Sequence, residues 1–233
     1  MNEFIIEERI LTEFGEEPHA YFCRFSIDRF RDDLFRQSGI HYPQNLTRAV
    51  AKRRAEFFAG RYCARSSLLA AGFASADIGI GDNRQPLWPN NVVGAISHSG
   101  SAAVAISARQ SRFAGLGVDV EREVECATYE KIKSQVLFGG EQSLVHQAGS
   151  RAHIYFSLVF SAKESFFKAA WPQVRRFFGF SALALLDIDS RENTLLFELA
   201  ETLSPELQKG RRVLADFRFF AGEQVMTLVK LEH

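Results

Sequence analysis

Two acidic segments hold the residues best suited to chemistry. Apolar and polar residues alternate over 116–121, which predicts a half-buried strand with Asp119 and Glu121 on one face. The later segment 160–169, Phe-Ser-Ala-Lys-Glu-Ser-Phe-Phe-Lys-Ala, predicts a helix on which Glu164 and Lys168 lie one turn apart on the same side. Three carboxylates and an ammonium could hold a hard divalent cation beside a negatively charged substrate. We therefore expect magnesium-assisted phosphoryl-group chemistry.

Cations are concentrated in the first half of the chain, in the predicted helix segment 52–61, Lys-Arg-Arg-Ala-Glu-Phe-Phe-Ala-Gly-Arg. A helical turn of about 100° per residue places Arg54 and Arg61 on nearly the same side, with Arg53 offset by roughly 80°. On composition alone, an anion site and a solvated basic face are equally good interpretations. A second candidate anion site is the Ser-His-Ser segment at 97–99, where a turn would offer several donors to a phosphate.

Composition excludes several classes of protein. The 233 residues contain 28 Lys plus Arg and 28 Asp plus Glu, so no global field attracts nucleic acid or an anionic membrane. The three cysteines have no metal-binding or disulfide-framework spacing, and no apolar run approaches the ~18 residues of a membrane span. We expect a monomeric cytoplasmic protein without a membrane span, whose 22 Phe residues mostly form the core.

The order of predicted elements indicates an α+β fold. Strands are predicted at 4–6, 20–27, 92–96, 102–107 and 113–121, and a long helix at 47–71 is followed by a loop over 79–91. Helices are predicted near 127–137, 141–148 and 153–171, the last ending at Pro172. The remainder predicts two hairpins, 180–188 with 194–200 and 212–220 with 224–231, which turn through 190–193 and 221–223.

The acidic segments resemble those of the 4′-phosphopantetheinyl transferases, in particular the surfactin-type and enterobactin-type enzymes. These enzymes carry a Gly-(Val/Ile)-Asp-(Val/Ile)-Glu strand and a Phe/Trp-(Ser/Thr)-x-Lys-Glu-(Ser/Ala)-x-x-Lys helix, and both are matched here without a gap. The similarity covers roughly residues 50–170. It implies two similar α/β subdomains in a pseudo-two-fold arrangement, with the active site at their interface. We place them at 1–111, for coenzyme A phosphate and adenine contacts, and 112–233, for magnesium and catalysis.

The resemblance also implies a role for each candidate residue. Magnesium ligands would be Asp119, Glu121 and Glu164, and Lys168 would neutralise charge on the departing phosphate. Glu164 or a metal-bound water would take the proton of the attacking serine. Coenzyme A would be held by Arg53 and Arg61 at the 3′-phosphate, by the Ser97 and His98 segment at its phosphates, and by Arg84 near the adenine. Lys163 faces another side of the helix and either contacts a phosphate or is solvated.

The expected reaction transfers 4′-phosphopantetheine from coenzyme A to a serine of an apo acyl or peptidyl carrier protein, as in siderophore or other secondary-metabolite biosynthesis. One alternative is another magnesium-dependent phosphodiester or nucleotidyl enzyme, although the neutral charge disfavours a nucleic-acid substrate. A second alternative is an inactive scaffold that binds a carrier protein. A serine nucleophile activated by His98 is a weaker hypothesis, because no G-x-S-x-G elbow surrounds it.

Overall fold

A computed structural model describes residues 3–15, 17–74, 77–220 and 223–233. The chain divides into two compact units, Met1–Arg112 and Phe113–His233. Each unit has its own cluster of buried apolar side chains. We describe the two units separately.

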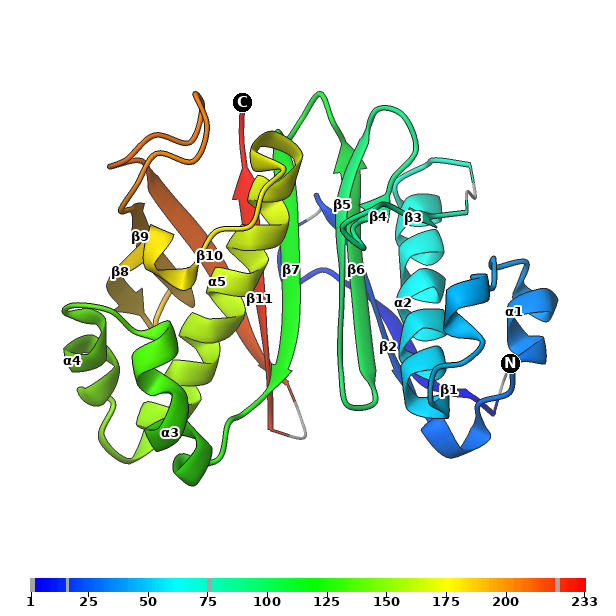
Figure 1. Cartoon of the computed structure of the whole chain (residues 1–233), viewed down its shortest axis with the longest axis horizontal. Helices are drawn as coiled ribbons and strands as arrows, with labels where there is room; N and C mark the ends of the chain where they lie inside the picture. Colours follow the sequence, from blue (N-terminus) through cyan, green and yellow to red (C-terminus); the bar gives the residue numbers. More distant parts are fainter. Residues whose placement is uncertain (1–2, 16, 75–76, 221–222) are drawn as a thin grey trace. The chain divides into compact units, whose positions relative to one another are not determined.

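The first unit is built on an antiparallel sheet of four strands. Their order is β1 (Ile5–Leu11), β2 (His19–Phe25), β6 (Ala102–Arg109) and β5 (Val92–Ser99). The long helix α2 (Ala51–Ala70) packs against β2, β6 and β5, and Figure 1 shows it running along this sheet. A short helix α1 (Asp33–Ser38) and a small hairpin, β3 (Gly79–Ile80) with β4 (Pro86–Leu87), complete the unit.

Helix α2 has the apolar spacing of a helix that packs on a sheet. Its buried residues recur at three- and four-residue intervals and include Ala55, Phe58, Ala59 and Cys63. At Gly60 the helix comes so close to β5 that an added Cβ atom would lie 2.9 Å from a methyl group of Ile96. The helix begins at Ala51 rather than at the predicted 47, because the backbone of Val50 is extended, with φ of −62° and ψ of 152°.

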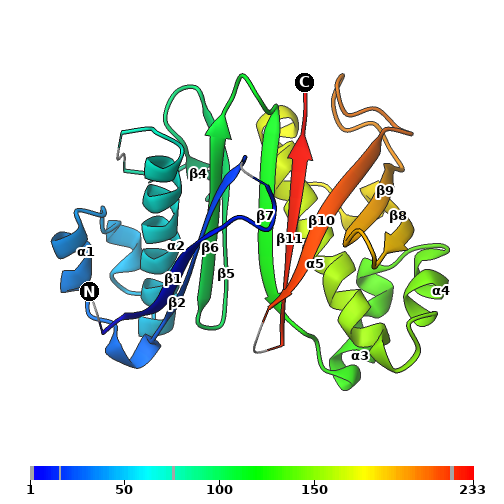
Figure 2. The same cartoon turned by 180° about the vertical axis from the view of Figure 1, so that it is seen from behind.

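The second unit carries a five-stranded antiparallel sheet. The strand order is β7 (Gly115–Arg122), β11 (Gln224–Leu231), β10 (Arg212–Phe220), β9 (Thr194–Leu199) and β8 (Leu183–Asp189). Three helices accompany it: α3 (Cys126–Val136), α4 (Glu141–His146) and α5 (Ala152–Val174). Helix α5 lies on β7, β11 and β10, and Figure 2 shows the sheet from its other side with α5 behind it.

Close packing of α5 on β7 depends on two glycines. A Cβ atom added at Gly115 would lie 2.0 Å from the carbonyl oxygen of Ala169, and one at Gly117 would lie 1.7 Å from that of Ser165. The glycine and aspartate face of β7 is therefore the face that α5 covers. Val118 and Val120 on the other face are buried too, so the predicted half-buried strand is wrong up to Val120.

The predicted fold class, α+β, is confirmed. Both predicted C-terminal hairpins are present, β8 with β9 and β10 with β11, although the second turn includes residues 221–222, which lie outside the described residues. Pro172 does not end α5, because it lies in the last turn and the helix stops only at Arg175, in a left-handed conformation. None of the helices in the described part of the chain is both long and apolar enough to cross a membrane.

The contact between α5 and β7 leads to a stability prediction. Gly117→Ala must push a methyl group into the helix backbone, so we expect the free energy of unfolding to fall by about 3 kcal/mol or more in urea titrations followed by circular dichroism. Gly140→Ala is the matched control, because no atom lies within 4 Å of an added Cβ atom there and its φ is −73°. Equal unfolding midpoints for the two variants would contradict this account of the packing.

Candidate active site

The two acidic segments of the second unit meet where α5 crosses β7. Asp119 lies on β7 with 3% of its surface exposed, and Lys168 extends from α5 to reach it. The Lys168 ammonium donates to Asp119 Oδ1 at 2.7 Å and to the carbonyl oxygen of Val118 at 3.0 Å. An ammonium has three N–H donors. Within the described chain, these two contacts of Lys168 use two of the donors, at a position that is one quarter exposed.

Glu164 belongs to the same cluster. Burial raises the pKa of its carboxyl, the Lys168 charge lowers it, and the Asp119 charge raises it again. The two carboxylates are therefore close enough to repel each other. Glu121 lies two residues beyond Asp119 on β7, on the same face of the strand, and is less buried. The structure thus brings Asp119, Glu164 and Lys168 together, with Glu121 adjacent along the strand.

The chemistry of this cluster fits a hard divalent cation. Magnesium prefers oxygen ligands from carboxylates, substrate phosphates and water, and carboxylate oxygens are what β7 and α5 supply. Bringing a cation between Asp119 and Glu164 would relieve their mutual repulsion. Among the residues that the structure describes, no group of three or more His, Cys, Asp or Glu side chains is arranged to hold a metal. Asp119, Glu121 and Glu164 are therefore proposed as metal ligands. Substrate oxygens or water would complete the coordination shell of the cation.

Lys163 occupies neither of the two positions expected for it. Its ammonium is buried, with 1% of the side chain exposed, and donates to Glu141 at 2.9 Å, to Val136 O at 2.9 Å and to Phe180 O at 3.2 Å. Burial lowers the pKa of Lys163, and the Glu141 carboxylate opposes that shift. All three donors are engaged by protein acceptors. The expected phosphate contact is therefore corrected to a structural ion pair.

Glu141 completes this buried pair. Its two oxygens accept from the backbone amides of Phe138 and Leu185, each at 2.6 Å. Through these contacts the pair connects α5 to the end of α3, to the start of α4 and to Leu185 of β8. Sequence reasoning did not single out Glu141. The only signal was an acidic residue at the start of a helix after Gly139 and Gly140.

An aromatic pocket opens beside Glu164. It has a volume of about 280 Å³ and is lined by Lys163, Glu164 and a set of mostly apolar residues from α5 and the segment after it: Phe166, Phe167, Phe177, Phe178, Gly179, Phe180 and Leu183. Phe177 is 70% exposed, whereas Phe178 and Phe180 pack against the core of the unit. The pocket can therefore take an uncharged chain next to an acidic group.

The predicted cations of the first unit converge on one cavity of about 350 Å³. Its lining residues come from α2, the β3–β4 hairpin, β5 and the segment before α2, and they include Arg53, Arg61, Arg84 and His98. Arg84 holds a left-handed conformation with φ of 64° in the turn between β3 and β4. Four cationic or protonatable side chains around one cavity are suited to an anion, and of these Arg61 is buried, whereas Arg53 and Arg84 are exposed.

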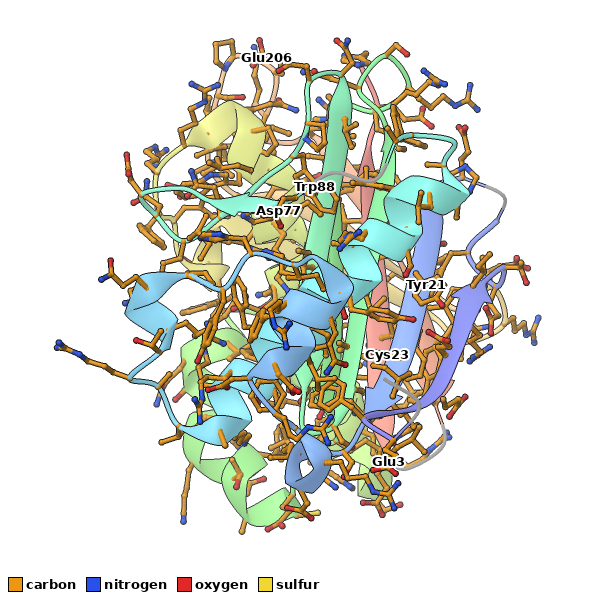
Figure 3. All side chains as sticks on the ribbon, turned by 90° about the vertical axis from the view of Figure 1, so that its right-hand side faces the viewer. Glu3, Tyr21, Cys23, Asp77, Trp88 and Glu206 are labelled. Atoms are coloured by element: carbon orange, nitrogen blue, oxygen red, sulfur yellow. The ribbon has the colours of Figure 1, made fainter. Side chains whose placement is uncertain are left out.

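Arg61 is the most buried cation of this cavity. One of its nitrogens donates to the carbonyl oxygen of Gly79 at 3.1 Å, and its guanidinium lies 4.6 Å from the centre of the Phe57 ring. Burial lowers the pKa of Arg61 to about 10, Asp77 (labelled in Figure 3) opposes this, and Arg53 adds to it. Within the described residues, the buried Nε of Arg61 has no hydrogen-bond partner. Arg61 therefore keeps its charge at neutral pH and retains donor capacity for an anion.

Ser97 and His98 have different surroundings. Both lie in β5 rather than in the predicted turn, and neighbouring side chains on a strand point to opposite faces. His98 and Ile96 line the cavity, whereas Ser97 is buried and is not among the lining residues. Ser97 therefore does not line the cavity that His98 lines, and its contact with a coenzyme A phosphate stays a prediction. Two other arginines of α2 do not line the cavity. Arg54 pairs with Asp32, and Arg65 donates to the carbonyl oxygen of Ser38.

Comparisons with known proteins point to one family. Residues 42–108 match the model of the 4′-phosphopantetheinyl transferase N-terminal domain, and residues 115–225 match that of the 4′-phosphopantetheinyl transferase superfamily. The chain is 32% identical over 151 residues to 4′-phosphopantetheinyl transferase Npt of Nocardia iowensis, covering 60% of this chain and 67% of that protein.

Two further relatives are similar over a comparable part of the chain. Identity is 37% over 130 residues with enterobactin synthase component D of Salmonella typhi, covering 56% of this chain and 53% of the relative. It is 31% over 139 residues with 4′-phosphopantetheinyl transferase PptT of Mycobacterium tuberculosis, covering 58% and 59%. The match thus spans between about half and two thirds of the length of these relatives.

The buried pair gives a prediction about stability. Glu141→Leu leaves the Lys163 ammonium buried without its carboxylate and removes the acceptor of two amides, so we expect a loss of about 3–5 kcal/mol in urea unfolding. Adding Lys163→Met should restore part of that loss, because no isolated charge then stays buried. Lys133→Met, which breaks an exposed pair with Glu130, is the matched control and should barely move the midpoint. A wild-type midpoint for Glu141→Leu would show that the pair is dispensable.

Proposed function

Because the chain belongs to the 4′-phosphopantetheinyl transferase superfamily, we propose that it transfers 4′-phosphopantetheine from coenzyme A to a serine of an apo acyl or peptidyl carrier protein. Adenosine 3′,5′-bisphosphate would be the other product. The observation that carries this proposal is the cluster of Asp119, Glu164 and Lys168, because it combines carboxylates for a cation with an ammonium for a phosphate. We assign the anion site that such a donor needs to the cationic cavity of the first unit.

We assign the 3′-phosphate of coenzyme A to Arg53, Arg61 and His98. Guanidinium groups present paired donors that match phosphate oxygens, and His98 adds a ring nitrogen at the same cavity. Arg84, on the hairpin that forms another wall, would lie toward the adenine end. The uncharged pantetheine chain suits the aromatic pocket beside Glu164.

The catalytic roles are assigned to the second unit. Asp119, Glu121 and Glu164 would hold Mg²⁺, which when bound would offset the charge of the pyrophosphate. We assign to Glu164 the role of accepting the proton of the carrier serine, because its carboxylate lies in the same cluster as Asp119 and Lys168. Lys168 donates to the phosphate oxygens as the bond to the leaving group breaks. Asp119 orients the Lys168 ammonium for that contact.

We propose a siderophore or related secondary-metabolite pathway, because several relatives are named enterobactin synthase component D. The three cysteines are free, which suits the reducing cytoplasm that we propose as the compartment. Intact-mass measurement of an apo carrier protein after incubation with coenzyme A and magnesium tests the reaction itself. Gain of one phosphopantetheine group supports it, and an unmodified carrier would favour a different magnesium enzyme or an inactive scaffold.

Substitution of the buried aspartate tests the metal and lysine site. Asp119→Asn keeps the volume but removes the charge that holds Lys168 and a cation, so turnover should fall by about a hundredfold or more. Far-UV circular dichroism and the unfolding midpoint monitor the fold. Asp216→Asn is the control, because it breaks a surface pair with Lys230. Turnover near that of the control in saturating magnesium would remove Asp119 from the catalytic set.

Donor discrimination tests the cationic cavity. The wild-type protein should prefer coenzyme A to dephospho-coenzyme A, and Arg53→Ala should remove much of that preference, because a charged contact contributes about 1.5–3 kcal/mol. Arg112→Ala changes an exposed arginine that pairs with Glu17 and should leave the preference intact. If the unmutated protein uses both donors equally, the cavity does not bind the 3′-phosphate.

A further inference from the structure

The cationic cavity of the first unit contains a carboxylate that no step of the proposed reaction uses. Glu56 lies on α2, lines the cavity and is largely buried, with 11% of its side chain exposed. Three cationic or protonatable groups surround it: Lys52 Nζ at 3.9 Å, a terminal nitrogen of Arg53 at 3.9 Å and His98 Nδ1 at 3.8 Å. A negative charge inside an anion site opposes binding unless it organises the groups that bind.

The contacts of His98 show what this carboxylate can organise. A terminal nitrogen of Arg53 lies 3.0 Å from His98 Nε2. Arginine can only donate, so Nε2 accepts and the ring hydrogen of the neutral imidazole is on Nδ1. That N–H faces the Glu56 side, at a distance that suits charge attraction rather than a direct hydrogen bond. A carboxylate beside one ring nitrogen commonly sets the orientation and tautomer of a histidine whose other nitrogen makes a functional contact, which here is the hydrogen bond that Nε2 accepts from Arg53.

Arg53 also needs a partner that fixes the conformation of its side chain. Half of its side chain is exposed, and its neighbour Arg61 is a buried cation that repels it. Glu56 lies one helical turn from Arg53 on α2, and the attraction between them favours the conformer that points into the cavity. One carboxylate is therefore placed to orient both Arg53 and His98.

We infer that Glu56 is a positioning residue for the 3′-phosphate site: it attracts Arg53 directly and orients the His98 ring that accepts from Arg53, and both contacts hold the Arg53 guanidinium toward the anion. The inference rests on the proposed function, because it assigns the cavity to the 3′-phosphate of coenzyme A. It predicts that Glu56 acts on donors that carry this phosphate and on no others. A purely structural role would affect every donor alike.

Donor kinetics on the full-length protein test this role. Glu56→Gln should raise the Michaelis constant for coenzyme A by about tenfold, the scale on which an orienting carboxylate acts. The constant for dephospho-coenzyme A and both turnover numbers should stay near the wild-type values. The double variant Glu56→Gln with His98→Gln should lose less than the sum of the two single losses, because part of the effect of Glu56 passes through the His98 ring. Glu7→Gln, which removes a carboxylate from the exposed pairs with Arg9 and Arg24, is the matched control.

Several other results of these measurements would overturn the inference. An equal loss with both donors, or additive losses in the double variant, would overturn the inference. Tighter binding of coenzyme A by Glu56→Gln would also overturn it and make Glu56 a competing counter-ion. If this variant does not fold, Glu56→Asp, which keeps the charge but withdraws it, should show a smaller loss confined to coenzyme A. If the wild-type protein does not discriminate between the donors, the proposed phosphate site itself fails.

Discussion

The close approach of α5 to β7 is the constraint on which the catalytic half of the structure depends. Without side chains at Gly115 and Gly117, the helix backbone lies directly on the strand. Lys168 can then reach Asp119 across the contact, and Glu164 comes close enough for the charges of both to shift its pKa. A bulkier residue at Gly117 would lift the helix and separate the groups that must act together.

Two lysines of this helix show how burial assigns different roles to the same side chain. Lys163 is enclosed, and three protein acceptors satisfy its ammonium. Lys168 is partly exposed and contacts two acceptors, one of them a carboxylate. Burying a charge is favourable only when it is paired and fully hydrogen-bonded, and such a group has no capacity left for substrate. The enclosed lysine therefore stabilises the fold, while the open one is available for chemistry.

The sequence-based predictions were accurate for features that depend on neighbouring residues and less accurate for contacts between distant parts of the chain. Periodicity and turn residues were sufficient for α5 and for the strands of the C-terminal hairpins. The partner of Lys163 could not be predicted, because Glu141 reaches it only after α4 packs near α5. The separation of Ser97 from His98 was missed because β5 extends further than its apolar residues indicate. The end of α5 was misplaced because a proline in the last helical turn removes only one hydrogen bond.

The charged groups of the cationic cavity are paired differently from those of the catalytic cluster. Around Asp119, opposite charges already pair, and the partly exposed Lys168 ammonium has a third N–H donor for a substrate phosphate. Around Arg61, burial lowers the pKa of the guanidinium, Asp77 opposes this shift, and the like charge of Arg53 adds to it. Before an anion enters, nearby carboxylates reduce this unfavourable charge: Asp77 acts on Arg61, and Glu56 lies beside Arg53. The position of Glu56 between Arg53 and His98 has this effect while leaving the cavity positively charged.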